Sequence, residues 1–263
     1  MPVPNPSLST CRSWLFVPGH DPARLVQALA YGAEAIVVDL EEFTPAPHRG
    51  AACADFLAFA SDCRRLGRLP AARINRLADG GHGELAELMP AIPAAIFLPR
   101  VESAQDVTAL DLALHVEEAR CGVEPGATAL IPTLETRLGI ERAHEILAAS
   151  PRLSAALIGT GDLAGDLGLS ASATDDERVA ALAPWRVRFL AACRDTGCLA
   201  IDGPWPQATS FAADQDWSMA QGYRARCVVD PGQVPLLHRM LGDANPATPG
   251  AASHKTNNDH REP

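Results

Sequence analysis

The sequence predicts a single-domain (β/α)8 TIM barrel, and three observations support this prediction. Eight short apolar runs recur along the chain, and a helical stretch separates each run from the next. Each strand–helix unit takes about 30 residues, which suits a barrel of about 250 residues better than an open sheet. The runs are continuous rather than alternating in polarity, as is typical of parallel strands covered on both faces. A dinucleotide-binding sheet is disfavoured, because no G-x-G-x-x-G pattern follows the first run.

Each expected strand is a short stretch of β-branched and other apolar residues that ends near a Gly, a Pro or a charged residue. In chain order the expected strands are 13–19, 35–41, 71–76, 95–101, 129–135, 155–163, 198–205 and 225–231.

The expected helices are recognised mainly by their ends. Asp21 and Pro22 begin the first helix, because aspartate caps helix N-termini and proline fits the first turn. Gly32 ends this helix. Ser103 and Asp106 resemble a capping box at the start of another. After the first helix, the expected helices are 49–67, 82–90, 103–119, 138–149, 178–196, 208–221 and 232–242.

Composition limits the function classes. Hydrophobic residues make up 47 % of the 263 residues, as in ordinary globular proteins. The net charge of −10 argues against nucleic-acid binding, which needs clustered Lys and Arg. Seven cysteines without a C-x-x-C pair favour a reduced, cytoplasmic chain. No signal-peptide core and no apolar run of about 18 residues is seen, so we expect no membrane span. We expect an extension over 1–11, a barrel domain over 12–244 and a disordered polar tail over 245–263.

Charged and polar residues gather in or just after the expected strands. In a barrel, the C-terminal ends of all strands meet at one face, where active sites lie. For any single residue, a charge at a partly solvated strand end is as good an explanation as a functional role. For charges that recur at the ends of most of the eight strands, solvation alone is a weaker explanation. The set comprises Asp39, Glu41, Glu42, Arg73, Asn75, Arg100, Glu102, Glu135, Arg137, Asp162, Asp166, Asp202 and Asp230.

Glu135 and Asp162 follow neighbouring strands and form a candidate metal site. Carboxylate oxygens suit a hard divalent cation such as Mg²⁺. The alternative is that each carboxylate caps a loop or pairs with an arginine such as Arg137. Gly159 and Gly161 form a small-residue turn at a helix start, whose amides can bind a substrate carboxylate.

Arg73 lies inside an apolar strand, where an unpaired charge is very costly. It either forms a structural ion pair with Asp39 or Glu41, or it faces a substrate oxygen. Arg12 and Arg100 present the same choice.

Several segments, in this order, resemble the HpcH/HpaI aldolase and citrate lyase beta-subunit family, especially its stand-alone citrate-lyase-beta-like proteins. They are RSWLFVPGH (12–20), AIVVDLEE (35–42), ARIN (72–75), IFLPRVESAQDV (96–107), IPTLETRLGI (131–140), LIGTGDLAGDLG (157–168), IDGP (201–204) and VVDPGQV (228–234).

The resemblance implies a barrel that assembles as homotrimers or hexamers and uses Mg²⁺, with Mn²⁺ as an alternative. It assigns the metal to Glu135 and Asp162. It makes Arg73 a substrate-binding and catalytic residue. The remaining residues that it places at the site are Glu41, Glu42, Arg100 and Gly161, with substrate binding assigned to Glu41, Arg100 and Gly161 and catalysis to Glu42.

The implied activity is Mg²⁺-dependent carbon–carbon cleavage of a 3-hydroxy-acyl thioester, such as citramalyl-CoA, malyl-CoA or a citryl thioester, into a keto acid and an acyl-CoA. One alternative is a metal-dependent pyruvate or oxaloacetate aldolase that acts on free hydroxy-keto acids. The other is a weakly catalytic subunit of a larger complex.

Three positions depart from the family pattern. Arg100 stands where Lys is common, Glu42 where Asp is common, and Asp230 where His is common. Arg and Lys differ in reach and geometry, so the substitution at Arg100 affects the site directly. CoA lyases of the family also carry a C-terminal lid that supplies an acidic group. Only a short polar stretch follows residue 240 here, so the sequence assigns no such group.

Overall fold

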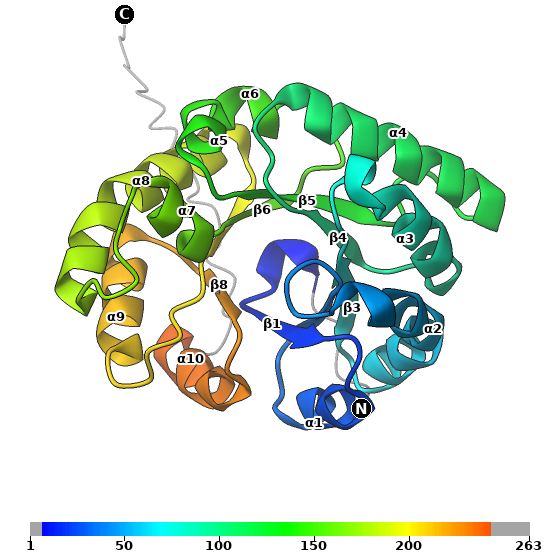
Figure 1. Ribbon diagram of the computed structural model, residues 1–263, viewed down its shortest axis with the longest axis horizontal. Coiled ribbons are helices and arrows are strands. Elements are labelled where there is room, and N and C mark those ends of the chain that lie inside the picture. The colour runs from blue at the N-terminus through cyan, green and yellow to red at the C-terminus, as the bar shows by residue number, and fades with distance from the viewer. Residues whose placement is uncertain (1–6, 243–263) are drawn as a thin grey trace, which may run out of the picture.

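The computed structural model describes residues 7–242, and these form a closed barrel of eight parallel strands. Each strand pairs with its neighbours in chain order, and β8 closes the barrel against β1. Figure 1 shows the helices arranged around this ring of strands. The predicted (β/α)8 fold is therefore confirmed. The strands are β1 (Ser13–Pro18), β2 (Ala35–Asp39), β3 (Leu69–Arg73), β4 (Ala95–Leu98), β5 (Ala129–Leu134), β6 (Ala155–Ile158), β7 (Leu199–Asp202) and β8 (Ala225–Val228).

The helices follow the predicted order, with two differences. The helix over Thr160–Asp166 lies outside the predicted helix ranges, and its first residues belong to the stretch predicted as a strand over 155–163. The stretch expected as one helix over 138–149 forms two short helices, because the backbone leaves helical geometry at Arg142. The predicted strands extend beyond the observed ends, since residues after each strand lie in a loop or, after β6, in the helix over Thr160–Asp166. The helices are α1 (Pro22–Ala30), α2 (Arg49–Arg65), α3 (Gly81–Leu88), α4 (Ala104–Cys121), α5 (Arg137–Glu141), α6 (Ala143–Leu147), α7 (Thr160–Asp166), α8 (Asp175–Thr196), α9 (Phe211–Gln221) and α10 (Val234–Leu241).

Both predicted helix caps form. The side chain of Asp21 accepts a hydrogen bond from the amide of Arg24 at the start of α1. Ser103 and Asp106 complete a capping box at the start of α4. These caps satisfy amides of the first turn that have no partner within the helix, and so they fix where each helix begins.

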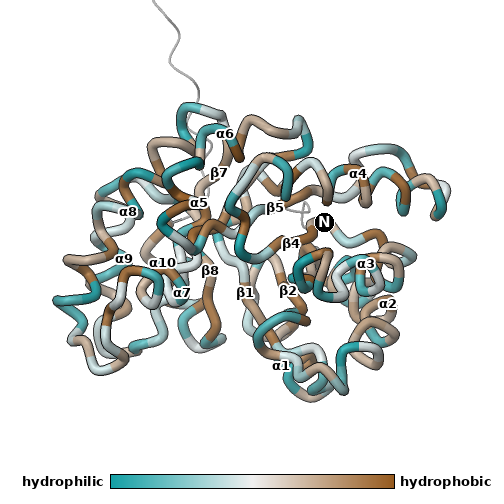
Figure 2. Tube along the Cα trace, turned by 45° about the horizontal axis from the view of Figure 1, so that its top comes forward, coloured by the Kyte–Doolittle hydropathy of each residue, from teal (hydrophilic) through white to brown (hydrophobic). Residues whose placement is uncertain are grey.

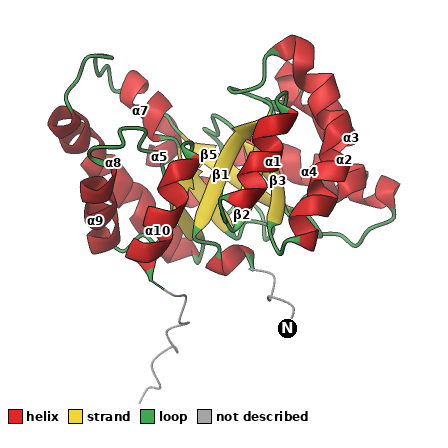
Figure 3. Cartoon of the chain, turned by 90° about the horizontal axis from the view of Figure 1, so that it is seen from below, coloured by secondary structure: helices red, strands yellow, loops and turns green. Residues whose placement is uncertain are grey.

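The core has two parts, which explains the continuous apolar runs. Side chains that point inward fill the barrel, among them Trp14, Phe16, Phe97 and Ile131. Side chains that point outward pack against the surrounding helices. Figure 3 shows the strands enclosed by helices, and Figure 2 shows hydrophobic residues concentrated along the strands. Since every strand is covered on both faces, alternation in polarity is lost.

Asp202, at the end of β7, belongs to a buried ion network rather than to the mouth of the barrel. Its carboxylate accepts hydrogen bonds from Arg186 of α8, with Nε 3.0 Å from Oδ1, and from Ser218 of α9. Asp214 joins Arg186 to Arg226 of β8. Each charge is compensated by its neighbours, so the network ties α8 and α9 to β7 and β8.

Other expectations have the following outcomes. Arg12 forms a structural ion pair with Glu34. All seven cysteines are free thiols. Within residues 7–242, no helix is both long and apolar enough for a membrane crossing. The predicted tail over 245–263 lies outside the described residues.

Candidate active site at the C-terminal mouth of the barrel

A cavity of about 230 Å³ opens at the C-terminal ends of the strands. Three residues of the predicted site line it: Arg73 from β3, Glu135 after β5, and Asp162 from the first turn of α7. Glu42 and Gly161 also line it. Its remaining lining residues are Phe16, Phe43, Thr133, Leu157, Gly159, Pro204, Pro206, Cys227 and Val229. The cavity therefore combines charged side chains with a lining that is largely apolar.

Arg73 makes a buried ion pair and also faces the cavity, so both of its predicted roles are compatible. Its Nε lies 2.7 Å from Oδ1 of Asp39, and its Nη2 lies 2.5 Å from Oδ2. Nη2 also donates to Glu42 at 3.0 Å. Nη1 lies 3.3 Å from Glu41 but makes no hydrogen bond among the described residues. Burial acts to lower the pKa of Arg73, yet the hydrogen bonds and charge of Asp39 outweigh it and raise that pKa.

Asp39 itself is fully buried and held by the loop that follows β2. Its two carboxylate oxygens accept hydrogen bonds from the backbone amides of Glu41, Glu42 and Phe43. The loop therefore fixes Asp39, and Asp39 in turn fixes the plane of the Arg73 guanidinium.

Glu135 is a buried carboxylate that no cationic side chain neutralises by direct contact in the described chain. Its side chain Oε1 accepts a hydrogen bond of 2.7 Å from the backbone amide of Arg100. Arg100 has a φ of +53°, which is unusual for a residue with a side chain and typical of strained positions near functional sites. Burial, together with the nearby charge of Asp162, raises the pKa of Glu135 to about 8.

Gly159 is required by the close approach of Glu135. A Cβ atom on Gly159 would lie 2.4 Å from Oε2 of Glu135 and 2.5 Å from its Cβ. No side chain other than hydrogen fits this space, so the small-residue turn predicted from the sequence serves to admit the carboxylate.

Asp162 is half-exposed and lies across the cavity mouth from Arg100. Oδ2 of Asp162 is 3.7 Å from Nη1 of Arg100, a weak contact between two exposed side chains. Arg137 does not pair with Glu135 or Asp162, which was the alternative considered from the sequence. It pairs instead with Asp166, one turn further along α7.

A divalent cation fits this arrangement on chemical grounds. Among the described residues, no group of three or more His, Cys, Asp or Glu side chains could hold a metal. Mg²⁺ does not need such a group, because it commonly takes one or two protein carboxylates and fills its shell with water and substrate oxygens. Burial and the charge of Asp162 raise the pKa of Glu135, because ionising this carboxyl would bury a negative charge that no cationic side chain of the described residues contacts. A cation held by the two carboxylates would compensate that charge.

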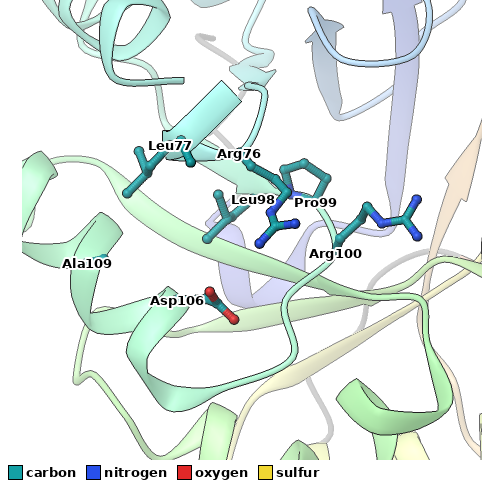
Figure 4. Close-up of a pocket in the computed structure, with 8 residues that line it drawn as sticks. Arg76, Leu77, Leu98, Pro99, Arg100, Asp106 and Ala109 are labelled. Carbon is teal, nitrogen blue, oxygen red and sulfur yellow. The ribbon is translucent and has the colours of Figure 1, made fainter. Parts of the chain in front are cut away.

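A second, smaller cavity lies beside the mouth, between the loop after β3 and the start of α4 (Figure 4). Arg76, Leu98 and Asp106 line it together with Arg100. Figure 4 shows the Arg100 guanidinium turned away from Arg76 and Asp106. Arg100 thus lines the smaller cavity and not the one at the mouth, and it approaches the mouth through its 3.7 Å contact with Asp162.

Sequence reasoning missed two residues at the site. Thr133 lines the cavity from β5, and its signal was the two-residue spacing from Glu135 that places both side chains on one face of the strand. Cys227 lines the cavity from β8, and burial raises the pKa of its thiol to about 12, so the thiol stays protonated. Asp230 caps the turn after β8 through a 2.8 Å hydrogen bond from Gly232 and does not line this cavity.

The sequence model of the HpcH/HpaI aldolase/citrate lyase family matches residues 12–225. The chain belongs to this family. Membership confirms the resemblance predicted from the sequence and the predicted enzyme class, carbon–carbon lyase.

Individual members of the HpcH/HpaI family are similar over most of the chain. The citrate lyase subunit beta of Escherichia coli (strain K12) is 29 % identical over 235 residues, which cover 88 % of this chain and 76 % of that protein. The L-malyl-CoA/beta-methylmalyl-CoA lyase of Cereibacter sphaeroides is 27 % identical over 259 residues, which cover 90 % of this chain and 81 % of that protein. A crystal structure of the protein CitE from Mycobacterium tuberculosis, in complex with magnesium, acetoacetate and coenzyme A, is 26 % identical. It superposes with a TM-score of 0.72 over 89 % of this chain and 82 % of that chain.

Proposed function

We propose that this protein is a Mg²⁺-dependent lyase that cleaves a 3-hydroxy-acyl thioester into a keto acid and an acyl-CoA. The observation that carries the proposal is the buried Glu135 carboxylate, which lies beside Asp162 and in the same cavity as Arg73. Relatives that act on malyl-CoA, and a neighbour solved with magnesium, acetoacetate and coenzyme A, support this substrate class. Citramalyl-CoA, malyl-CoA and citryl thioesters are the candidate substrates.

Glu135 and Asp162 would hold the cation. When bound, Mg²⁺ supplies a Lewis acid for the carboxylate and hydroxyl or keto oxygens of the substrate. Mn²⁺ has similar ligand preferences and is expected to substitute. Gly161 would offer its backbone amide, which lies in the first helical turn and has no intrahelical partner, to the substrate carboxylate.

Arg73 and Glu42 would perform the proton and charge chemistry. In the cleavage direction, a base removes the proton of the substrate 3-hydroxyl, the carbon–carbon bond breaks, and the electron pair moves onto the thioester carbonyl oxygen. Glu42 would accept that proton, and its position in the lining of the cavity supports this role. Nη1 of Arg73 lies 3.3 Å from Glu41 but makes no hydrogen bond among the described residues, and it would bind the developing enolate oxygen. One donor of this kind contributes about 3 kcal/mol of transition-state stabilisation.

Glu41 and Arg100 would act at the edge of the site. Glu41 is partly buried against Arg73, and burial raises its pKa. Its carboxylate limits the motion of Nη1. Arg100, beside the mouth, is suited to a negatively charged group at the outer end of the substrate. A change from Lys to Arg at this position would alter the preferred distance to that group.

The assembly is expected to be a cytoplasmic homotrimer or hexamer. Leu112 and Val116 lie four residues apart on α4 and are 65 % and 56 % exposed, so this helix presents an apolar stripe that an assembly could cover. Light scattering after size-exclusion chromatography tests this expectation, and a monomer at micromolar concentration would contradict it.

Turnover with matched substrates tests the proposed function. The purified chain is given malyl-CoA, citramalyl-CoA and citryl-CoA with Mg²⁺, and in parallel the corresponding free acids. Cleavage of thioesters but not of free acids supports the proposal. Cleavage of free hydroxy-keto acids would instead support a metal-dependent aldolase, and no turnover of either class would favour a subunit that needs partner proteins.

A further inference from the structure

Thr133 places a buried hydroxyl without a partner next to the catalytic cavity. It lies on β5, two residues before Glu135, and therefore faces the barrel interior as Glu135 does. Thr133 is 1 % exposed and lines the cavity that Arg73 and Asp162 also line. Its Oγ1 has no hydrogen-bond partner among the described residues.

Thr133 differs in this respect from the other buried threonines that the structure describes. Five threonines are buried in the described residues, and the other four are hydrogen-bonded through their hydroxyls. Thr44 donates to Asp39, Thr128 to Pro93 and Thr160 to Pro204, and Thr136 accepts from Gly139. Among the described residues the hydroxyl of Ser154 is also buried without a partner, but Ser154 does not line the cavity, so Thr133 is the threonine or serine of the site whose hydroxyl is unsatisfied. Burying a hydroxyl without a hydrogen bond is unfavourable, so such a group calls for a partner that the protein itself does not supply.

The neighbours of Thr133 cannot provide that partner. Leu157 is its register partner on β6, and Phe16 and Cys227 line the same cavity. Arg73, which lines the same cavity, donates to Asp39 and Glu42 and makes no hydrogen bond to Thr133. In this layer of the barrel the Thr133 hydroxyl is thus the polar group among apolar side chains, and it is a donor that needs an acceptor.

We propose that Thr133 is a specificity-determining residue whose hydroxyl donates a hydrogen bond to an oxygen of the keto-acid part of the substrate. This inference rests on the proposed function, because a keto acid supplies carboxylate and carbonyl oxygens as acceptors and must lie near Glu135 and Asp162. The apolar side chains around Thr133 then contact the carbon skeleton, and the hydroxyl fixes which way the small acid points. Specificity follows because an analogue without an oxygen at that place leaves the hydroxyl unpaired.

The test compares Thr133→Val with Thr133→Ser and with Thr128→Val. Valine has nearly the shape of threonine without the hydroxyl, and serine keeps the hydroxyl. Binding of pyruvate in the presence of Mg²⁺ is measured by calorimetry, Mg²⁺ binding alone is measured as a second readout, and urea unfolding reports stability. We expect Thr133→Val to weaken pyruvate binding roughly tenfold, as loss of one hydrogen bond does, with unchanged Mg²⁺ affinity and unchanged or higher stability. Thr133→Ser should bind within about threefold of wild type.

Thr128→Val is the matched control, because it removes a threonine hydroxyl that has a protein partner. It should lower stability and leave pyruvate binding unchanged. If Thr133→Val binds pyruvate as tightly as wild type does, the inference is wrong and an ordered water satisfies the hydroxyl. If wild type binds Mg²⁺ but no keto acid, the proposed function fails and this inference fails with it.

Discussion

The guanidinium of Arg73 lies against both carboxylate oxygens of Asp39, at 2.7 and 2.5 Å, and this pair joins β2 to β3 below the mouth of the barrel. The pairing leaves Nη1 as the nitrogen of Arg73 without a hydrogen bond in the described chain. Asp39 therefore acts as a positioning residue, since it sets which donor of Arg73 is available to a substrate. The pair is structural and functional at once.

Asp39→Asn should reduce turnover while leaving Mg²⁺ binding intact. An asparagine keeps the size of the side chain but removes its charge and one of its two acceptor oxygens, so the guanidinium is no longer held in one plane. We expect kcat to fall roughly tenfold or more, as with misplaced catalytic groups, and KM to change less. Calorimetric Mg²⁺ titration of the same variant checks that the metal site persists. An unchanged kcat would show that Asp39 does not position Arg73.

Arg73→Ala should lose stability as well as activity. Removing one partner leaves the Asp39 carboxylate buried and unpaired, which costs about 3 kcal/mol or more. Urea unfolding measures this loss. The matched control is Arg137→Ala, which breaks an exposed pair with Asp166 and should cost less than about 1 kcal/mol. Equal effects of the two substitutions would contradict the importance given to the buried pair.

Gly159→Ala should abolish Mg²⁺ binding while the barrel stays folded. The new methyl group would overlap Oε2 of Glu135, and the carboxylate or the turn before α7 must move. We expect metal affinity to fall by more than tenfold, as when a supporting residue of a metal site is changed. Gly165→Ala, in the same helix, introduces a methyl group into open space and should leave the affinity unchanged. Equal Mg²⁺ affinity in both variants would contradict the assignment of Glu135.

Glu135→Gln should stabilise the metal-free protein at neutral and higher pH. The folded-state pKa of Glu135, about 8, is above its ordinary value of 4.5. The folded protein therefore holds this proton where the unfolded chain releases it, and stability falls as pH rises from about 4.5 to about 8. Glutamine cannot ionise, so the variant escapes that loss. Urea unfolding of both proteins between pH 5 and 9 should show the stability advantage of the variant growing with pH up to about 8 and then levelling off. A constant difference across this range would show that Glu135 has an ordinary pKa.

Mg²⁺ and the proton on Glu135 should compete for the same carboxylate. Mg²⁺ needs the ionised carboxylate, so its apparent affinity should rise between pH 6.5 and 8.5, and protons should be released on binding below pH 8. Calorimetry in two buffers of different ionisation enthalpy measures the proton release. An affinity that does not depend on pH would contradict a raised pKa at the metal site.

Asp162→Asn should remove most of the Mg²⁺ affinity, whereas Asp166→Asn, one turn along α7, should not.

The fold was predictable because an expected strand followed by an expected helix recurs eight times along the chain. Continuous apolar strands, helix caps such as Ser103 and glycine stops define each unit locally, and closure of the barrel follows from their number. The helix break at Arg142 was not predictable, because the apolar pattern continues through it.

The candidate site was predictable only in part. Strand-end position brought Arg73, Glu135 and Asp162 together, because the ends of parallel strands meet at one face. The same rule put Asp202 among the candidates, although it is buried in an ion network with Arg186, since spacing does not reveal which way a strand-end side chain turns. The hydrogen bond from the backbone amide of Arg100 to Glu135 could not be predicted from the sequence, because a backbone contact does not depend on the type of side chain.

The most direct test of the central claim is the release of the two products by the purified chain. Malyl-CoA and citramalyl-CoA are incubated with wild type, Glu135→Gln and Asp166→Asn, each with Mg²⁺ or with EDTA, and keto acid and acyl-CoA are quantified by chromatography. We predict equal amounts of the two products from wild type and Asp166→Asn with Mg²⁺, and none from Glu135→Gln or in EDTA. Full cleavage by Glu135→Gln, or cleavage by wild type in EDTA, would contradict a metal-dependent lyase site at Glu135 and Asp162.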